Sequence, residues 1–179
     1  MADPLVVATA LRIERFALRR GLRGVPVTAV GMGVRHPSRL ALPAGAALVV
    51  AGLAGALVDG LNPGDLVVDD RSLALSLRGN GFVVHHGAVA FSDHLVGSAE
   101  RAELAARTGA LAVDMESAGL LALAGDRPHA VVRAIVDTPS RPLLGPATLG
   151  GGIAALRRLA AIGPVLRHWA ESNAKEVHQ

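Results

Sequence analysis

The 179-residue chain contains no cysteine and no tyrosine, and it has only one tryptophan and three phenylalanines. Without cysteine, disulfide bonds and thiolate metal sites are excluded, and redox chemistry gives no indication of the compartment. Aromatic residues make up 2% of the chain. The core must therefore be built from Leu, Val, Ile and Ala, which are abundant here.

Groups that titrate between His and Arg are also nearly absent, since the chain has a single lysine, Lys175. The net charge of +3 is small, yet it pushes the sequence pI to about 10.9. The high pI is therefore no indication of nucleic-acid binding, and we expect no nucleic-acid partner. The one dense group of arginines lies between residues 12 and 23. It spreads over a predicted helix and its end, which favours a solvated helix face over a site for an anionic partner.

One uncharged run, residues 40–58, is 19 residues long and could cross a bilayer. A proline and several glycines interrupt it, so a buried strand, a loop and a second strand is the better interpretation. The N-terminus lacks a secretory pattern, because Asp3 precedes a short apolar run that Arg12 interrupts. We expect a cytoplasmic protein without a membrane span, forming a single domain over residues 1–179.

Strand-like and helix-like segments alternate along the chain. Strands are predicted at residues 5–10, 25–30, 46–51, 66–68, 82–91, 111–113 and 130–136. Helices are predicted at residues 11–20, 98–107, 117–124 and 151–171. Ser98 is the predicted N-cap of the second helix, and the last helix is predicted to bend at Gly163-Pro164. Residues 52–55 are predicted to be a loop. This alternation predicts an α/β fold, a three-layer sandwich around a mainly parallel twisted sheet.

The last two predicted strands each end in carboxylates. Asp114 and Glu116 follow the first of them, and Asp137 follows the second. Ligands bind at the carboxyl ends of strands in open α/β sheets, so we expect Glu116 and Asp137 to meet at one rim. The alternative is that these acids only begin helices, with Asp114 or Ser117 as an N-cap.

Three segments, taken in order, resemble the purine nucleoside phosphorylase and nucleosidase superfamily. They are Ala-Gly-Leu-Ala-Gly-Ala at 51–56 with Asn-Pro-Gly-Asp-Leu-Val-Val at 62–68, Val-Asp-Met-Glu-Ser at 113–117, and Val-Val-Arg-Ala-Ile-Val-Asp at 131–137. Within the superfamily, the glycine segment and residues 108–117 look closest to hopanoid-associated phosphorylases, which release adenine from adenosylhopane. Residues 6–15 are more similar to futalosine and methylthioadenosine nucleosidases.

The resemblance implies cleavage of the N-glycosidic bond of a purine nucleoside, with adenine as the base. It implies no metal and no cofactor, although phosphate is a possible co-substrate. Asp137 would donate a proton toward the purine, Glu116 would accept from the ribose hydroxyls, and Met115 would pack on the sugar. An ordinary aspartate is ionised at pH 7, so the first role requires burial or a hydrogen-bond relay that favours the protonated form. Arg133 is interpreted as a structural charge.

Residues 92–96 resemble the part of the family that carries the base-binding backbone. The residues that this likeness and the adjoining strand assign to substrate binding are Asp93, Leu95, Val96 and Val113. Leu95 stands where the family commonly has a phenylalanine that stacks on the purine. His94 is either a second ligand group or a surface residue.

The nucleophile is left open by the residues. Glu14 aligns with the glutamate that activates water in the nucleosidase branch. The alternative is an exposed helix acid that pairs with Arg19 or a neighbouring arginine. Phosphorolysis needs a phosphate cradle, for which Gly31, Gly33 and Arg12 are weak candidates. Hydrolysis and phosphorolysis are nearly balanced, and the family likeness tilts slightly toward a phosphorylase.

The sequence also leaves two other functions open. The chain could be a catalytically impaired nucleoside-binding protein of the same fold, because it is short for the family around residues 70–79 and before Val25. It could also be a doubly wound domain for another phosphorylated ligand. Family likeness implies a homo-oligomer. An adenosylhopane-like substrate would need an apolar channel, which residues 143–146 could line.

Overall fold

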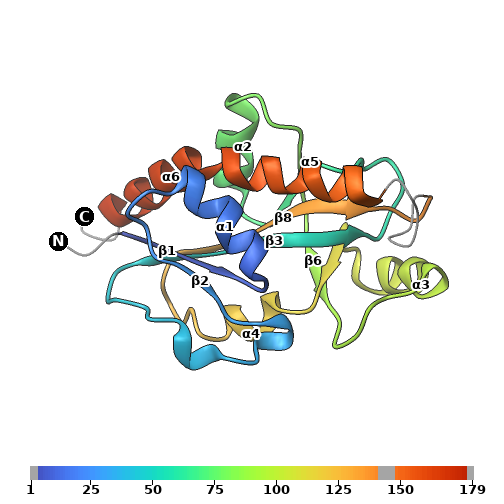
Figure 1. Cartoon of the computed structure of the whole chain (residues 1–179), viewed down its shortest axis with the longest axis horizontal. Helices are drawn as coiled ribbons and strands as arrows, with labels where there is room; N and C mark the ends of the chain where they lie inside the picture. Colours follow the sequence, from blue (N-terminus) through green and yellow to red (C-terminus); the bar gives the residue numbers. More distant parts are fainter. Residues whose placement is uncertain (1–3, 141–147, 177–179) are drawn as a thin grey trace.

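The computed structural model describes residues 4–140 and 148–176. Eight strands form one sheet, ordered β2-β1-β3-β8-β4-β5, with β7 pairing with both β3 and β6 (Figure 1). The strands are β1 Leu5–Thr9, β2 Val27–Ala29, β3 Ala47–Ala56, β4 Leu66–Val68, β5 Val84–His86, β6 Val89–Phe91, β7 Ala112–Asp114 and β8 His129–Asp137. The β3–β7 and β4–β8 pairs are antiparallel and the other described pairs are parallel. The predicted mainly parallel sheet is confirmed.

Helices cover both faces of this sheet (Figure 1). They are α1 Arg12–Gly21, α2 Arg71–Gly79, α3 Ser98–Thr108, α4 Ser117–Leu121, α5 Thr148–Ala161 and α6 Gly163–Glu176, with short 3-10 turns at Met32–Val34 and Pro37–Arg39. Side chains of α1, α2, α5 and α6 form one hydrophobic cluster with the sheet, and α4 packs into a second cluster on the opposite face. The three-layer arrangement predicted from the alternation is therefore present.

The central strands are apolar throughout because both of their faces are buried. In β1, Leu5 and Val7 belong to the first cluster, whereas Val6 and Ala8 belong to the second. Neighbouring residues on a strand point to opposite faces, so a strand buried on both sides has no polar positions to alternate. The described core contains few aromatic side chains, as the composition predicted: Trp169 on α6 is buried in the first cluster, and the partly buried Phe82 packs against it.

Several predicted boundaries are wrong. Residues 52–55 are not a loop, because β3 continues to Ala56. The strand predicted at 82–91 is two strands, β5 and β6, and the N-cap of α3 is Gly97 rather than Ser98. The C-terminal helix predicted at 151–171 is two helices, α5 and α6, which are divided at Ile162, next to the predicted bend at Gly163-Pro164.

One helix was missed altogether. Helix α2 occupies the segment interpreted as shortened, and the Asp70 side chain caps it by accepting from the Leu73 N–H at 2.7 Å. No described helix is long and apolar enough to cross a membrane. Residues 143–146, the predicted channel lining, lie outside the described residues.

Candidate active site

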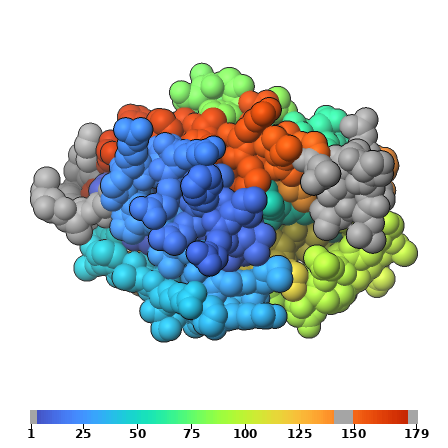
Figure 2. All heavy atoms as spheres, in the orientation of Figure 1, coloured from blue at the N-terminus to red at the C-terminus, as the bar shows by residue number. Residues whose placement is uncertain are grey.

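A pocket of about 490 Å³ lies where β1, β3, β7 and β8 end, closed on its sides by the start of α1 and by α3. Atoms from the region of β7 (yellow) are visible between α1 (blue) and α3 (yellow-green) in Figure 2. The sequence-predicted residues that line this pocket are Glu14, Leu95, Val96, Val113, Met115, Glu116 and Asp137. Four others, Arg12, Gly31, Gly33 and Asp93, are not among its lining residues.

Glu14 is buried in the first turn of α1, with 2% of its surface exposed. Its two carboxylate oxygens accept from the backbone N–H groups of Leu11 at 2.7 Å and Leu53 at 2.8 Å. Burial raises the pKa of Glu14 above its usual value, and the two N–H donors and nearby Arg133 offset part of that rise. The interpretation of Glu14 as an exposed acid paired with Arg19 is therefore wrong, because the side chain faces the pocket.

Glu116 reaches the same pocket from the end of β7. It is 5% exposed, and its Oε1 accepts from the Gly33 N–H at 3.2 Å. Burial raises the pKa of Glu116, while the charge of Arg133 acts in the opposite direction. Glu116 lines the pocket, where a ligand hydroxyl could reach its carboxylate.

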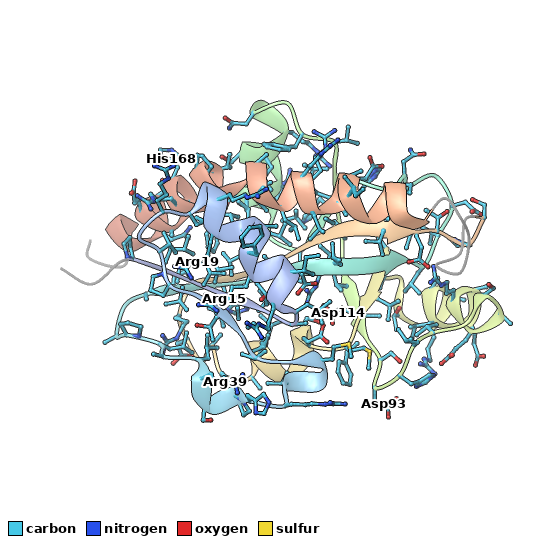
Figure 3. All side chains as sticks on the ribbon, viewed as in Figure 1. Arg15, Arg19, Arg39, Asp93, Asp114 and His168 are labelled. Atoms are coloured by element: carbon cyan, nitrogen blue, oxygen red, sulfur yellow. The ribbon has the colours of Figure 1, made fainter. Side chains whose placement is uncertain are left out.

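Asp114, which is labelled in Figure 3, forms a buried ion pair with Arg133, whose charge acts on both Glu14 and Glu116. Asp114 Oδ1 accepts from the N–H groups of Glu116 and Ser117 and from the Ser117 hydroxyl, at 2.7–3.1 Å. Asp114 therefore holds the start of α4 as the helix-start alternative predicted, but the N-cap residue is Glu116, and Asp114 also lines the pocket. Arg133 is fully buried, which agrees with its interpretation as a structural charge.

Asp137 lies at the end of β8 and is 3% exposed. It is ion-paired with Arg101 of α3, whose Nη1 donates to the Ala56 carbonyl at 3.0 Å and whose Nε donates to the Val96 carbonyl at 3.4 Å. Arg101 is a site residue that the sequence motifs did not indicate. Its position three residues before Leu104, on the buried face of α3, was the available signal.

Two glycines of β3 make room for these charged groups. A Cβ atom at Gly52 would lie 2.5 Å from Arg133 Nη1, and one at Gly55 would lie 2.9 Å from Asp137 Oδ1. A β-bulge in β8 shifts the register between Ala54 and Gly55, so that Gly55 lies opposite Asp137. The glycine segment therefore belongs to the site as a strand and not as a loop.

The segment between β6 and α3 forms one side of the pocket mouth. His94 lines the pocket and bridges Asp93 at 2.7 Å and Glu100 at 2.8 Å. These two hydrogen bonds raise the pKa of His94, and the bond to His94 lowers the pKa of Asp93. Asp93 itself points outward (Figure 3). Leu95 lines the pocket although 78% of its surface is exposed.

The candidates for a phosphate cradle are placed differently. The Gly31 N–H donates to the Ala10 carbonyl at 3.0 Å, and the Gly33 N–H donates to Glu116. Arg12 lines a separate cleft of about 360 Å³. Within residues 4–140 and 148–176, no cluster of three or more His, Asp or Glu residues could hold a metal ion.

No protein-family model and no curated protein sequence matches the chain. Solved structures do match. One is a putative 5′-methylthioadenosine/S-adenosylhomocysteine nucleosidase from Borrelia burgdorferi bound to adenine, with a TM-score of 0.75 and 14% identity over 92% of this chain and 99% of that one. Another is the corresponding nucleosidase of Campylobacter jejuni, with a TM-score of 0.75 and 16% identity over 96% and 100%.

A third is the futalosine hydrolase of Helicobacter pylori, with a TM-score of 0.67 and 19% identity over 96% of this chain and 97% of that one. Likeness at these identities establishes the fold. The chain therefore shares the fold of these nucleosidases, in agreement with the fold that the sequence motifs predicted.

Proposed function

We propose that the protein hydrolyses the N-glycosidic bond of a purine nucleoside. The observation that carries this proposal is the convergence of Glu14, Glu116 and the Arg101–Asp137 pair on one pocket. Its volume of about 490 Å³ falls in the ordinary range for small-molecule sites, roughly 300–1,000 Å³. By analogy with glycoside hydrolysis, the reaction passes through a ribosyl oxocarbenium ion, which anionic groups stabilise.

Glu14 is suited to activate the attacking water. A general base works best when its pKa lies near the working pH, and burial raises the pKa of Glu14 in that direction. The N–H groups of Leu11 and Leu53 hold both carboxylate oxygens in place, so the side chain needs little reorganisation during the reaction.

Glu116 is suited to bind the ribose. A carboxylate that accepts from the 2′ and 3′ hydroxyls fixes the sugar and places negative charge near the developing cation. The Asp114–Arg133 pair beneath it fixes the backbone from which Glu116 extends. Met115 lines the pocket next to it, where the sugar would lie.

Hydrolysis is favoured over phosphorolysis by what surrounds the proposed nucleophile. The N–H groups of Gly31 and Gly33 already donate within the protein, and Arg12 lines another cleft. Arg101, a cationic side chain that lines the pocket, already donates to Asp137. A phosphate ion would therefore compete with Asp137 for Arg101 and would gain no donor from Gly31, Gly33 or Arg12.

The proposed base is adenine, and the proposed 5′ substituent is apolar. The Borrelia nucleosidase was solved with adenine, and an aspartate-to-asparagine variant of the Helicobacter pylori nucleosidase was solved with 5′-methylthioadenosine in its active site. Met32 and Leu95 line the pocket and are 47% and 78% exposed, so an apolar substituent would cover them. Adenosylhopane is one substrate of this class.

A homo-oligomer is part of the same proposal. Ile13 and Phe16 on α1 are 53% and 63% exposed, close in sequence to Glu14. A second copy of the chain would bury these side chains. Light scattering across a range of protein concentrations tests this, and a constant monomer mass would contradict it.

The decisive experiment is adenine release from adenosine, 5′-methylthioadenosine and an adenosine with a long apolar 5′ substituent, each with and without phosphate. We expect release without phosphate, highest kcat/KM for an apolar 5′ group, and a loss of about 10²–10⁴-fold in Glu14→Gln. Glu103→Gln is the matched control, because Glu103 is exposed on α3 and does not line the pocket. Release that requires phosphate would show that the protein is a phosphorylase and not a hydrolase.

A second candidate, nucleoside binding without turnover, is favoured by one observation. The Asp137 carboxylate, which would otherwise be free to face the purine, is ion-paired with Arg101. Calorimetric binding of adenine, with no release from any nucleoside in the panel, would establish this candidate.

A further inference from the structure

We propose that the cleft lined by Arg12, Arg15 and Arg39 is a binding site for a phosphate monoester, separate from the nucleoside pocket. The other wall of the cleft is β2, Val27–Ala29, and no residue lines both the cleft and the pocket. The sequence favoured a solvated face for the arginines between residues 12 and 23. The structure sets Arg12 and Arg15 apart from the rest of that group, because they line a cavity. This inference goes beyond the proposed function and does not depend on it.

The cleft carries positive charge without a compensating carboxylate. Residues 10–40 hold seven of the chain's 18 Lys and Arg residues but only one of its 15 Asp and Glu residues, Glu14. Glu14 lines the nucleoside pocket and not this cleft. In the part of the chain that the structure describes, none of Arg12, Arg15 and Arg39 forms an ion pair. Gathered like charges repel one another, so an anion that contacts all three relieves the repulsion.

The three arginines reach the cleft from two elements. Arg12 and Arg15 lie in the first turn of α1 and are three residues apart, so they share one face of the helix. Arg39 belongs to the 3-10 turn at Pro37–Arg39 (Figure 3, where Arg15 and Arg39 are labelled). Arg15 is half-buried, and its Nε donates to the Val27 carbonyl at 2.9 Å. That bond fixes the guanidinium against β2, and a guanidinium has further N–H donors with which to bind an anion.

The backbone of β2 adds a donor to the same cleft. This strand lies at the edge of the sheet, where it pairs with β1. The Pro26 carbonyl and the Val30 N–H bond to β1, so alternate residues between them, Val27 and Ala29, direct their backbone groups away from the sheet. The bond from Arg15 to the Val27 carbonyl agrees with this direction. The Ala29 N–H comes next along that edge, and outward N–H groups at a sheet edge favour anions.

This set of donors matches a phosphate monoester. Guanidinium groups bind phosphate oxygens in pairs, through two parallel N–H···O bonds. A phosphate monoester carries a charge of about −1.5 to −2 at pH 7, which suits several arginines better than a single carboxylate does. The cleft has a volume of about 360 Å³, near the lower end of the range of roughly 300–1,000 Å³ for small-molecule sites. It therefore has room for the phosphate group and a small organic body.

Calorimetric titration at low ionic strength tests the site, with glucose 6-phosphate as the probe and glucose as its uncharged counterpart. We expect the ester to bind and glucose not to bind. Arg15→Gln and Arg39→Gln each remove one charged donor and are expected to weaken binding by about tenfold or more. Arg39 is exposed, so Arg39→Gln tests the site without disturbing a buried contact. Arg19→Gln is the matched control, because Arg19 is exposed on the same helix and does not line the cleft. Its effect should stay within about twofold.

A second arm separates a soluble ester from a lipid headgroup of the same chemistry. Phosphatidate also presents a phosphate monoester, so the chain is sedimented with phosphatidylcholine vesicles that contain phosphatidate. Binding of glucose 6-phosphate assigns the cleft to soluble esters. Binding of the vesicles alone, lost in Arg39→Gln and kept in Arg19→Gln, assigns it to a lipid headgroup.

Three results would overturn the inference. The first is no binding in either arm. The second is equal weakening in Arg19→Gln and Arg39→Gln, which would show diffuse attraction to a basic surface. The third is tighter binding of glucose 6-phosphate in Glu116→Gln, because removal of that carboxylate would favour an anion only in the nucleoside pocket. None of these measurements uses turnover, so they give the same answer whether or not the proposed function holds.

Discussion

Gly52 of β3 lies directly against the carboxylate of Glu14: a Cβ atom at Gly52 would lie 2.9 Å from Glu14 Oε1. Gly55 stands in the same relation to Asp137. The two glycines are three residues apart, whereas the facing residues Arg133 and Asp137 are four apart, and the bulge in β8 accommodates the difference. The Gly-Leu-Ala-Gly segment thus spaces two buried charged groups along one strand.

Alanine at either glycine is therefore expected to damage the site. In Gly52→Ala and Gly55→Ala, the methyl group must displace Glu14 with Arg133, or Asp137 with Arg101, and we expect kcat/KM to fall by at least about tenfold. The measurement is adenine release together with the far-ultraviolet circular dichroism of each variant.

Gly152→Ala is the matched control for these two variants. Gly152 lies inside α5, and a Cβ there would meet no atom within 4 Å. This change is expected to leave activity unaltered and to stabilise the protein by about 0.5–1 kcal/mol. Wild-type activity in both Gly52→Ala and Gly55→Ala would contradict the spacing role of the segment.

The activity should decline on the acid side because of Glu14. Burial raises its pKa, so its base form is lost as pH falls through that raised value, sooner than for an ordinary glutamate. A kcat/KM profile tests this. His94 also lines the pocket and titrates, so the profile is repeated in His94→Gln. An acid limb that disappears in His94→Gln would show that Glu14 does not cause it.

Glu116 gives a prediction about stability. Because burial raises its pKa in the folded state, it favours folding most at pH values below its usual 4.5, and that contribution is lost as pH rises through the raised value. The glutamine in Glu116→Gln cannot ionise. The Tm of the variant minus the Tm of wild type should therefore become more positive as pH rises. Its nucleoside cleavage should fall, because a neutral amide replaces the ribose acceptor.

Thermal unfolding from about pH 4 to about pH 8 measures this difference. Gln keeps an oxygen that can accept from the Gly33 N–H, so the comparison isolates the charge. A Tm difference that stays constant across the range, or that favours wild type more at high pH, would contradict the prediction.

The sequence predicted which strand ends carry the acidic site residues, but it did not predict the conformation of the glycine segment beside them. Carboxylates at the ends of apolar strands predicted that Glu116 and Asp137 would meet, and both line the pocket. The expected reason does not hold, because β7 is antiparallel to β3 whereas β8 is parallel to it, so the two acids do not follow parallel strands. The glycine segment was predicted to be a loop, because glycine is common in loops. Glycine within a strand instead marks the close approach of another group, here Glu14 and Arg133.

Other features depended on contacts far apart in the sequence. Local spacing suggested that Glu14 could pair with Arg19 on an exposed face, but Leu53 of β3 captures its carboxylate instead. Arg101 and Asp137 are 36 residues apart, and no local pattern links them. Helix α2 was missed because residues 70–79 were interpreted only as a shortened segment, although the Asp70 cap is visible in the sequence.

The segment between β6 and α3 should respond to pH through His94. The hydrogen bonds to Asp93 and Glu100 raise the pKa of His94, so the protonated imidazole ties the segment to α3. This contribution is present below the usual pKa of 6.5 and is lost as pH rises through the raised value. We therefore expect KM for nucleosides to increase as pH rises through that value, because the pocket mouth loosens.

Proton NMR titration of the imidazole tests this directly, with His94→Gln identifying the resonance. In Glu100→Gln the imidazole loses one carboxylate partner, so both the titration and the rise in KM should move to lower pH. Glu103→Gln removes an exposed carboxylate of the same helix that makes no contact with His94, and should move neither. If the titration moves in Glu100→Gln while the KM profile does not, His94 is ion-paired at the rim without controlling access, and entry to the pocket depends on the apolar side chains of Met32 and Leu95 alone.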